Sequence, residues 1–218
     1  MELHELINAD DPAMPIVREW ISRAVRPVEI LVPSSSRDNV LVQMQVTTRS
    51  PMGAVAYETG GILIDRGWLR VLGSGHPRLT RTLPGWNMNR GVGFYLVADD
   101  AVGGFFAING GALGGDLKNL YYFASDTLRW EPLNFGYSAS LEWACTGKYD
   151  VFCHALRWPG WEVDVAAVQG DRCLITWPPL WTKEGHGPSA HRANVPVEEA
   201  WGVQMDFARQ LKTGGGNG

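Results

Sequence analysis

The sequence has few cysteines and no apolar run long enough to cross a membrane. Its three cysteines lie far apart and form no C-x-x-C pair: Cys145, Cys153 and Cys173. An odd, sparse set of this kind excludes a disulfide scaffold. The first residues, MELHELINADD, lack the basic and apolar regions of a secretory signal. We therefore expect reduced thiols, a cytoplasmic location and no contact with a membrane.

The sequence also lacks a basic patch and the common catalytic and cofactor motifs. Lys and Arg total 19 against 23 Asp and Glu, and this net charge of −4 predicts no nucleic-acid partner. The glycine-rich segment 110–115 has neither the lysine nor the Ser/Thr of a phosphate loop. His186 and His191 do not have the spacing of a zinc site, and Cys153 and His154 diverge by about 100° on a helix. We predict no cofactor and no metal; enzymatic activity is left open but disfavoured.

Tryptophan, by contrast, is abundant. The ten tryptophans are scattered along the chain without a fixed period, so they indicate no repeat array. Two interpretations are open. The rings fill the core, which is the favoured interpretation, or some of them form an exposed surface that anchors a partner.

Residues 92–134 carry the clearest structural pattern. Short apolar runs alternate there with turns rich in Gly, Asn and Asp; the runs are Phe94–Ala98, Phe105–Ile108, Leu120–Ala124 and Leu128–Leu133. This spacing is typical of four strands in an antiparallel meander. We expect Asp99 and Asp100 to accept hydrogen bonds from backbone N–H groups of the first turn rather than to form an acid pair.

The segments around this meander predict further strands and several helices. Ser50-Pro51 opens a helix that runs to Glu58, and Gly67 favours a hairpin between segments 62–64 and 68–72. β-Branched or alternating residues predict strands at Val28–Val32 and Val40–Thr47. The remaining expectations are helices near 2–8, 12–24, 137–146, 162–168 and 196–212, a strand at 173–177 and a polar loop at 183–194.

Together these elements predict an α+β fold. The strands pair locally and no βαβ alternation occurs, so the sheet is expected to be an antiparallel meander of about six strands with flanking helices. We predict one domain over residues 1–212. The glycine-rich end of the chain, residues 213–218, is expected to be a disordered tail.

The segment Gly73–Asn89 holds the best candidate binding residues. It is long enough to be a functional loop and is rich in Gly, Pro, Arg and Asn. Its imidazole, guanidinium, indole and amide groups are suited to hold a ligand or an acidic group of a partner. The candidates are His76, Arg78, Arg81, Trp86 and Asn87. A solvated surface loop is the alternative interpretation.

Several elements between residues 48 and 146 follow one another in a distinctive order. They are the helix after Ser50-Pro51, Gly103-Gly104 before a strand, the strands YYFASD and LRWEPL, and a helix that opens at Tyr137-Ser138. This order resembles the SUKH superfamily, the cell-wall-regulator-like proteins of bacteria that include toxin-immunity proteins. The resemblance implies a SUKH-like core over about 48–146 with N- and C-terminal helical additions. It also implies a non-enzymatic module that binds another protein, but no individual functional residue.

Over its full length the chain resembles a second bacterial family, whose members share strings like RWPGW at Arg157–Trp161 and QVTTRSP at Gln45–Pro51. That resemblance implies no activity. Our first hypothesis is therefore a protein-binding module that engages another protein near the sheet, and the SUKH resemblance implies that it is of the toxin-immunity type. The alternative is a small-molecule sensor or enzyme, with His76 as acid/base and Arg78 as an anion clamp. A homo-oligomer that buries exposed tryptophans is a third hypothesis.

Overall fold

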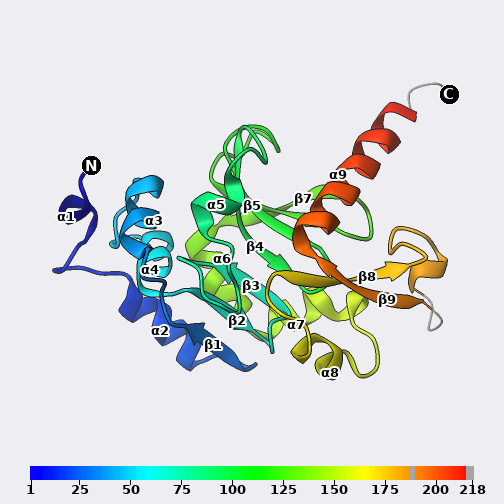
Figure 1. Cartoon of the computed structure of the whole chain (residues 1–218), viewed down its shortest axis with the longest axis horizontal. Coiled ribbons are helices and arrows are strands. Elements are labelled where there is room, and N and C mark those ends of the chain that lie inside the picture. The colour runs from blue at the N-terminus through cyan, green and yellow to red at the C-terminus, as the bar shows by residue number, and fades with distance from the viewer. Residues whose placement is uncertain (187–189, 215–218) are drawn as a thin grey trace.

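A seven-stranded antiparallel sheet forms the centre of the protein, and its strands follow their order in the sequence (Figure 1). The computed structural model describes residues 1–186 and 190–214. The strands are β1 Val28–Leu31, β2 Gly61–Ile64, β3 Leu69–Leu72, β4 Phe94–Asp100, β5 Phe105–Asn109, β6 Asn119–Ala124 and β7 Arg129–Gly136. The predicted α+β class and the predicted meander over 92–134 are both confirmed, with β1 to β3 extending the meander on one side.

Helices surround this sheet. They are α1 Leu3–Leu6, α2 Met14–Ser22, α3 Arg37–Met44, α4 Pro51–Glu58, α5 Leu83–Asn87, α6 Tyr137–Ala144, α7 Gly147–Cys153, α8 Trp161–Ala166 and α9 Val197–Gly214, with short 3-10 turns at His154–Leu156 and Glu184–His186. The predicted start of α4 is confirmed, because the Ser50 side chain accepts a hydrogen bond from the backbone N–H of Gly53. No helix among the described residues is long and apolar enough to span a bilayer.

A second, two-stranded sheet joins the C-terminal part of the chain to the main sheet. Strand β8, Arg172–Trp177, pairs antiparallel with β9, His191–Pro196. The backbone N–H of Leu174 donates to the carbonyl of Ala101, next to the end of β4, over 2.7 Å. Helix α9 follows β9 directly (Figure 1).

Alternation along the central strands sends aromatic rings to both faces of the sheet. Phe105 and Phe123 lie opposite each other in the register, and the Phe105 ring meets Trp201 of α9 at 4.8 Å. The next pair, Phe106 and Tyr122, points the other way, and the Tyr122 ring lies 5.0 Å from Phe152 of α7. Helix α9 therefore covers one face of the meander and α7 covers the opposite face.

Most tryptophans belong to the core or its margin, as the favoured interpretation predicts. Trp68, Trp86, Trp161 and Trp201 are buried, and the largely exposed one among the described side chains is Trp177. The hydrophobic core is one cluster that reaches from Ala13 to Trp201.

The predicted strand at Val40–Thr47 is wrong, because residues 37–44 form α3. In a strand Val40 and Val42 would share a face, but in the helix Val40 and Leu41 are buried and Val42 is exposed. A short apolar run fits both the two-residue period of a strand and the 3.6-residue period of a helix, and the packing of α3 against α4 decides between them. The helix ends where Gln45 adopts a left-handed conformation, with φ 53°.

Two predicted loops contain regular structure. Helix α5 occupies the end of the segment Gly73–Asn89, and β9 begins at His191 within the predicted loop 183–194. Neither element has a strong local pattern, and each is stabilised by a distant partner, β4 for α5 and β8 for β9. The disordered tail predicted over residues 213–218 begins two residues too early, since α9 extends to Gly214. Residues 215–218 lie outside the described part of the chain.

Candidate functional site

A groove of about 700 Å³ lies between α9 and the sheet, and we call it the α9 groove. Its lining comes from the loop after α5, from β4, from the β5–β6 loop, from the β6–β7 hairpin and from α9. The residues are Asn89, Arg90, Phe94, Ala112, Leu113, Phe123, Leu128, Arg129, Trp130, Trp201, Met205, Ala208 and Arg209. Segments more than one hundred residues apart thus meet at one surface.

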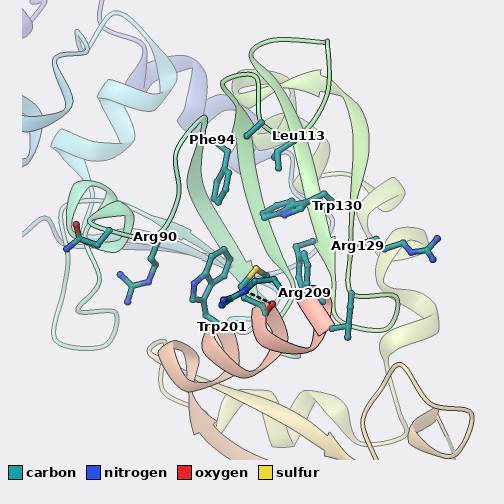
Figure 2. A pocket seen from close by; sticks show the side chains of 13 residues that line it. Arg90, Phe94, Leu113, Arg129, Trp130, Trp201 and Arg209 are labelled. Carbon is teal, nitrogen blue, oxygen red and sulfur yellow. Dashed lines mark hydrogen bonds between the residues drawn. The ribbon is translucent and has the colours of Figure 1, made fainter. Parts of the chain in front are cut away.

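Aromatic rings form the wall of the α9 groove. Phe94 and Trp130 approach from the sheet and Trp201 approaches from α9 (Figure 2). The Phe94 ring lies 5.4 Å from Trp130 and 6.4 Å from Trp201, and Trp130 also meets Phe123 at 5.3 Å. These contacts hold the rings in place, while Phe94 and Trp130 remain only partly buried. The groove therefore offers a preformed aromatic surface to a binding partner.

Arginines supply the charge at the rim of the α9 groove. Arg90 and Arg129 lie on opposite sides of it, and Arg209 belongs to α9 (Figure 2). Arg90 donates to Glu198 over 2.6 Å and stacks on Trp86 at 3.8 Å, so its guanidinium is held in position. Arg129 is exposed and forms no ion pair with any residue that the structure describes. No carboxylate is among the described residues of the lining. Glu198 pairs with Arg90 and Asp206 pairs with Arg209 over 2.6 Å, so Arg129 is the rim charge that favours an anionic or acidic partner.

The predicted site residue His76 lies at a different hollow, of about 590 Å³, which we call the serine pocket. Hydroxyl groups from two loops line it together with His76: Ser34, Ser35, Ser36, Ser74, Thr80 and Thr82. His76 Nδ1 accepts a hydrogen bond from the backbone N–H of Arg78 over 3.1 Å, so Nε2 carries the ring proton when the imidazole is neutral. The Arg78 side chain turns away to an exposed ion pair with Glu29 and does not line the pocket.

The other three predicted site residues make contacts within the protein. Arg81 pairs with Asp99 and with Asp171, and the Asp171 contact is 3.0 Å long. Trp86 is buried beneath Arg90. Asn87 donates to the carbonyl of Leu96 and accepts from its backbone N–H, at 2.8 and 2.7 Å. The structure therefore does not bring the five predicted residues together at one surface, and their role in binding stays a prediction.

Asp99 and Asp100 were expected to serve the same turn, and the structure separates them. Asp100 does so, since its Oδ1 accepts from the backbone N–H of Val102 and of Gly104 at 2.9 and 2.7 Å. For Asp99 the expectation is wrong. Its fully buried carboxylate accepts from Arg70 over 2.6 Å and also pairs with Arg81. Arg70 reaches Asp99 from the neighbouring strand β3, where the two residues are opposite in the register, and Arg81 reaches it from the segment before α5.

The residues of the α9 groove were missed because no single segment of sequence contains them. One signal was available: Trp201, Met205 and Ala208 recur at helical spacing on one face of the predicted C-terminal helix. Those three side chains line the groove. The periodicity indicates a buried face but not which strands will lie opposite it.

The cysteines do not provide a reactive nucleophile. All three are buried and free, and burial raises the pKa of Cys145 to about 11 and that of Cys153 and Cys173 to about 12. Each thiol is therefore neutral near pH 7. Within the described part of the chain, no three His, Cys, Asp or Glu side chains come together as a metal site would require.

The chain has relatives in two bacteria. A family model described as "Protein of unknown function DUF2625" matches residues 3–200. The uncharacterised protein YbfG of Escherichia coli strain K12 is 42% identical over 210 residues, which cover 94% of this chain and 96% of YbfG. An uncharacterised protein of Haemophilus influenzae is 40% identical over 186 residues, 82% of each chain. No solved structure matches the chain. By sequence, the chain belongs to the DUF2625 family.

Proposed function

We propose that the protein is a non-enzymatic binding module whose α9 groove holds an acidic, aromatic- or aliphatic-rich segment of another protein. The observation that carries this proposal is the combination of an aromatic wall with the exposed Arg129, which has no ion pair among the described residues, and with no carboxylate among the described residues of the lining. Aromatic residues and arginine are the types that dominate protein–protein binding energy. A partner segment with both acidic and apolar side chains matches both features.

The arrangement also supports a macromolecular partner over a small one. Small-ligand sites combine an apolar cavity with a few polar groups that converge on the ligand. In the α9 groove the guanidinium groups of Arg90 and Arg129 lie at opposite rims instead (Figure 2). Charges at a rim steer a partner and set the rate of association, while buried rings provide the affinity. A bacterial toxin is the partner class that the SUKH resemblance implies, and we keep it as the finer form of this proposal.

Site-specific photo-crosslinking in the native host tests the proposal. A photoreactive phenylalanine analogue at Leu113, inside the groove, is expected to capture a partner with an acidic segment. The same analogue at Val151, an exposed position on α7, is the control. Equal capture of the same proteins at both positions would count against the groove.

Two substitutions then locate the binding surface on the purified partner. Ala112→Trp fills the groove from an exposed loop position and is expected to abolish binding, whereas Ala166→Trp, exposed on α8, is its matched control. Arg129→Glu is expected to slow association several-fold and to weaken its salt dependence; Arg49→Glu, also exposed, should change neither. Full binding by Ala112→Trp would refute the proposal.

The serine pocket favours a second candidate function, a small-molecule sensor. The observation is the gathering of hydroxyl groups around His76 in a hollow of about 590 Å³. A ligand there would lose affinity on His76→Gln and keep it on Ala112→Trp, so ligand binding by the two variants separates the two functions.

A further inference from the structure

A small cavity on the other side of α9 has the features of a separate ligand site. It has a volume of about 100 Å³ and lies among β8, the segment after β8 and α9; we call it the β8–α9 cavity. Its lining is Val102, Ser125, Ile175, Thr176, Trp177, Pro179, Leu180, Trp181, Ala200, Val203, Gln204 and Phe207. Apolar and aromatic groups dominate this set, and none of these residues is charged.

Three side-chain oxygen atoms in the lining have no hydrogen-bond partner among the described residues. Ser125 Oγ, Thr176 Oγ1 and Gln204 Oε1 form no hydrogen bond, although the residues are only 2%, 8% and 3% exposed. A buried polar atom without a hydrogen bond destabilises the folded protein, and such atoms are rare in native structures. Three of them at one cavity give a bound molecule three positions at which to form hydrogen bonds.

The backbone places Gln204 at this cavity. Gly103, in the β4–β5 turn, has φ +81°, and a Cβ atom there would lie 2.6 Å from Gln204 Nε2. The absence of a side chain at Gly103 thus leaves the space that the glutamine amide occupies. Trp181 also lines the cavity, and its ring lies 5.2 Å from that of Phe207.

We propose that the β8–α9 cavity binds a small neutral molecule with a compact apolar body and at least one O–H or N–H donor. The carbonyl of Gln204 requires a donor, and the hydroxyls of Ser125 and Thr176 can both accept and donate. The uncharged lining excludes an ion, since no group on it would balance a buried charge.

The size of the cavity sets the size of the molecule. An apolar cavity of about 150 Å³ holds benzene, so the smaller β8–α9 cavity encloses a short branched alcohol, or a single ring whose outer edge lies in the mouth. Trp177, Val203 and Phe207 line the cavity and are partly exposed, and they form the mouth through which a substituent would project.

Phenol and fluorobenzene are matched probes for this site, because they have nearly the same shape and fluorobenzene has no hydrogen to donate. Ligand-observed NMR is expected to show phenol bound about five- to tenfold more tightly than fluorobenzene, the effect of one hydrogen bond. Benzoate, which is charged, should not bind. Equal affinities for phenol and fluorobenzene, or no binding of phenol at millimolar concentration, would overturn the proposal.

Thr176→Val gives a second measurement that does not depend on finding the natural ligand. The substitution keeps the shape of the side chain and removes the unpartnered hydroxyl. It is expected to raise the Tm of the free protein by about 2–4 °C and to reduce the preference for phenol. A lower Tm together with unchanged phenol binding would show that the hydroxyl is already satisfied by water, against the proposal.

Val203→Trp tests the location, because the larger ring blocks the mouth. It is expected to abolish phenol binding, while Val163→Trp, at an exposed position on α8 outside the cavity, should leave it unchanged. Phenol binding by Val203→Trp at the parental affinity would place the probe elsewhere on the protein and would contradict the assignment.

Discussion

Replacing Arg81 with alanine is expected to lower the free energy of unfolding by about 3 kcal/mol. The Arg81 side chain is 10% exposed and joins the fully buried Asp99 to Asp171, and it also donates to the carbonyl of Gly170 over 2.6 Å. Breaking a buried ion pair by removing one partner typically costs about 3–5 kcal/mol, because a charge is left uncompensated.

The lower end of this range applies for two structural reasons. Asp99 keeps its hydrogen bond from Arg70, at 2.6 Å, when Arg81 is removed. Asp171 is partly exposed and keeps the hydrogen bond that the backbone N–H of Thr80 donates over 2.7 Å. Each carboxylate would therefore keep at least one hydrogen bond after Arg81 is removed.

Arg78→Ala is a matched control from the same segment. Arg78 donates to both oxygens of Glu29, at 2.5 and 3.0 Å, but the two side chains are 54% and 53% exposed. Solvent screens such a pair, and its loss is expected to change the unfolding free energy by less than about 1 kcal/mol. The two arginines differ in burial rather than in the type of partner.

Urea unfolding followed by far-UV circular dichroism measures both variants. For a chain of this length, the loss at Arg81 corresponds to a fall in Tm of about 6–12 °C. A double-mutant cycle of Arg81→Ala with Asp171→Asn measures the coupling directly. Equal stability of the Arg81 and Arg78 variants would refute the argument that burial decides the contribution of these pairs.

Three further results are expected. In the native protein the thiols of Cys145, Cys153 and Cys173 should resist alkylation by iodoacetamide at pH 7, because burial raises their pKa to about 11, 12 and 12. Labelling within minutes would contradict this expectation. For Cys153 and Cys173, the thiol of the unfolded chain ionises as pH rises through about 9, whereas the thiol of the folded protein stays largely neutral until about pH 12. The free energy of unfolding should therefore fall between pH 9 and 12 by up to about 1.4 kcal/mol per pH unit for each of these two thiols, and a flat urea midpoint over that range would count against the shifts. Gly103→Ala should destabilise the protein by about 1–3 kcal/mol, because φ is +81° and the new Cβ would meet a buried amide. Gly202→Ala, on α9 with open space around it, should stabilise the protein slightly. Urea unfolding measures both variants, and a Gly103→Ala variant more stable than Gly202→Ala would contradict the reasoning.

The candidate sites show that the sequence alone does not predict which polar side chains reach the surface. The polar composition of the segment Gly73–Asn89 predicts a binding surface, yet Arg81 pairs with Asp99 and Asp171, and Trp86 is buried. Composition describes which groups a segment carries. It does not state whether those groups face solvent or a distant carboxylate, because that depends on how the elements pack.

The sequence by itself determined the elements whose causes are local. Alternation with a period of two and the turns between runs define β4 to β7, and the serine before a proline defines the start of α4, because short-range sterics and nearby hydrogen bonds act there. Tertiary structure decided the rest. Residues 37–44 became a helix, Asp99 gained two arginines, and Trp201 came to face Phe94 across the α9 groove, since each outcome depends on burial against residues distant in the chain.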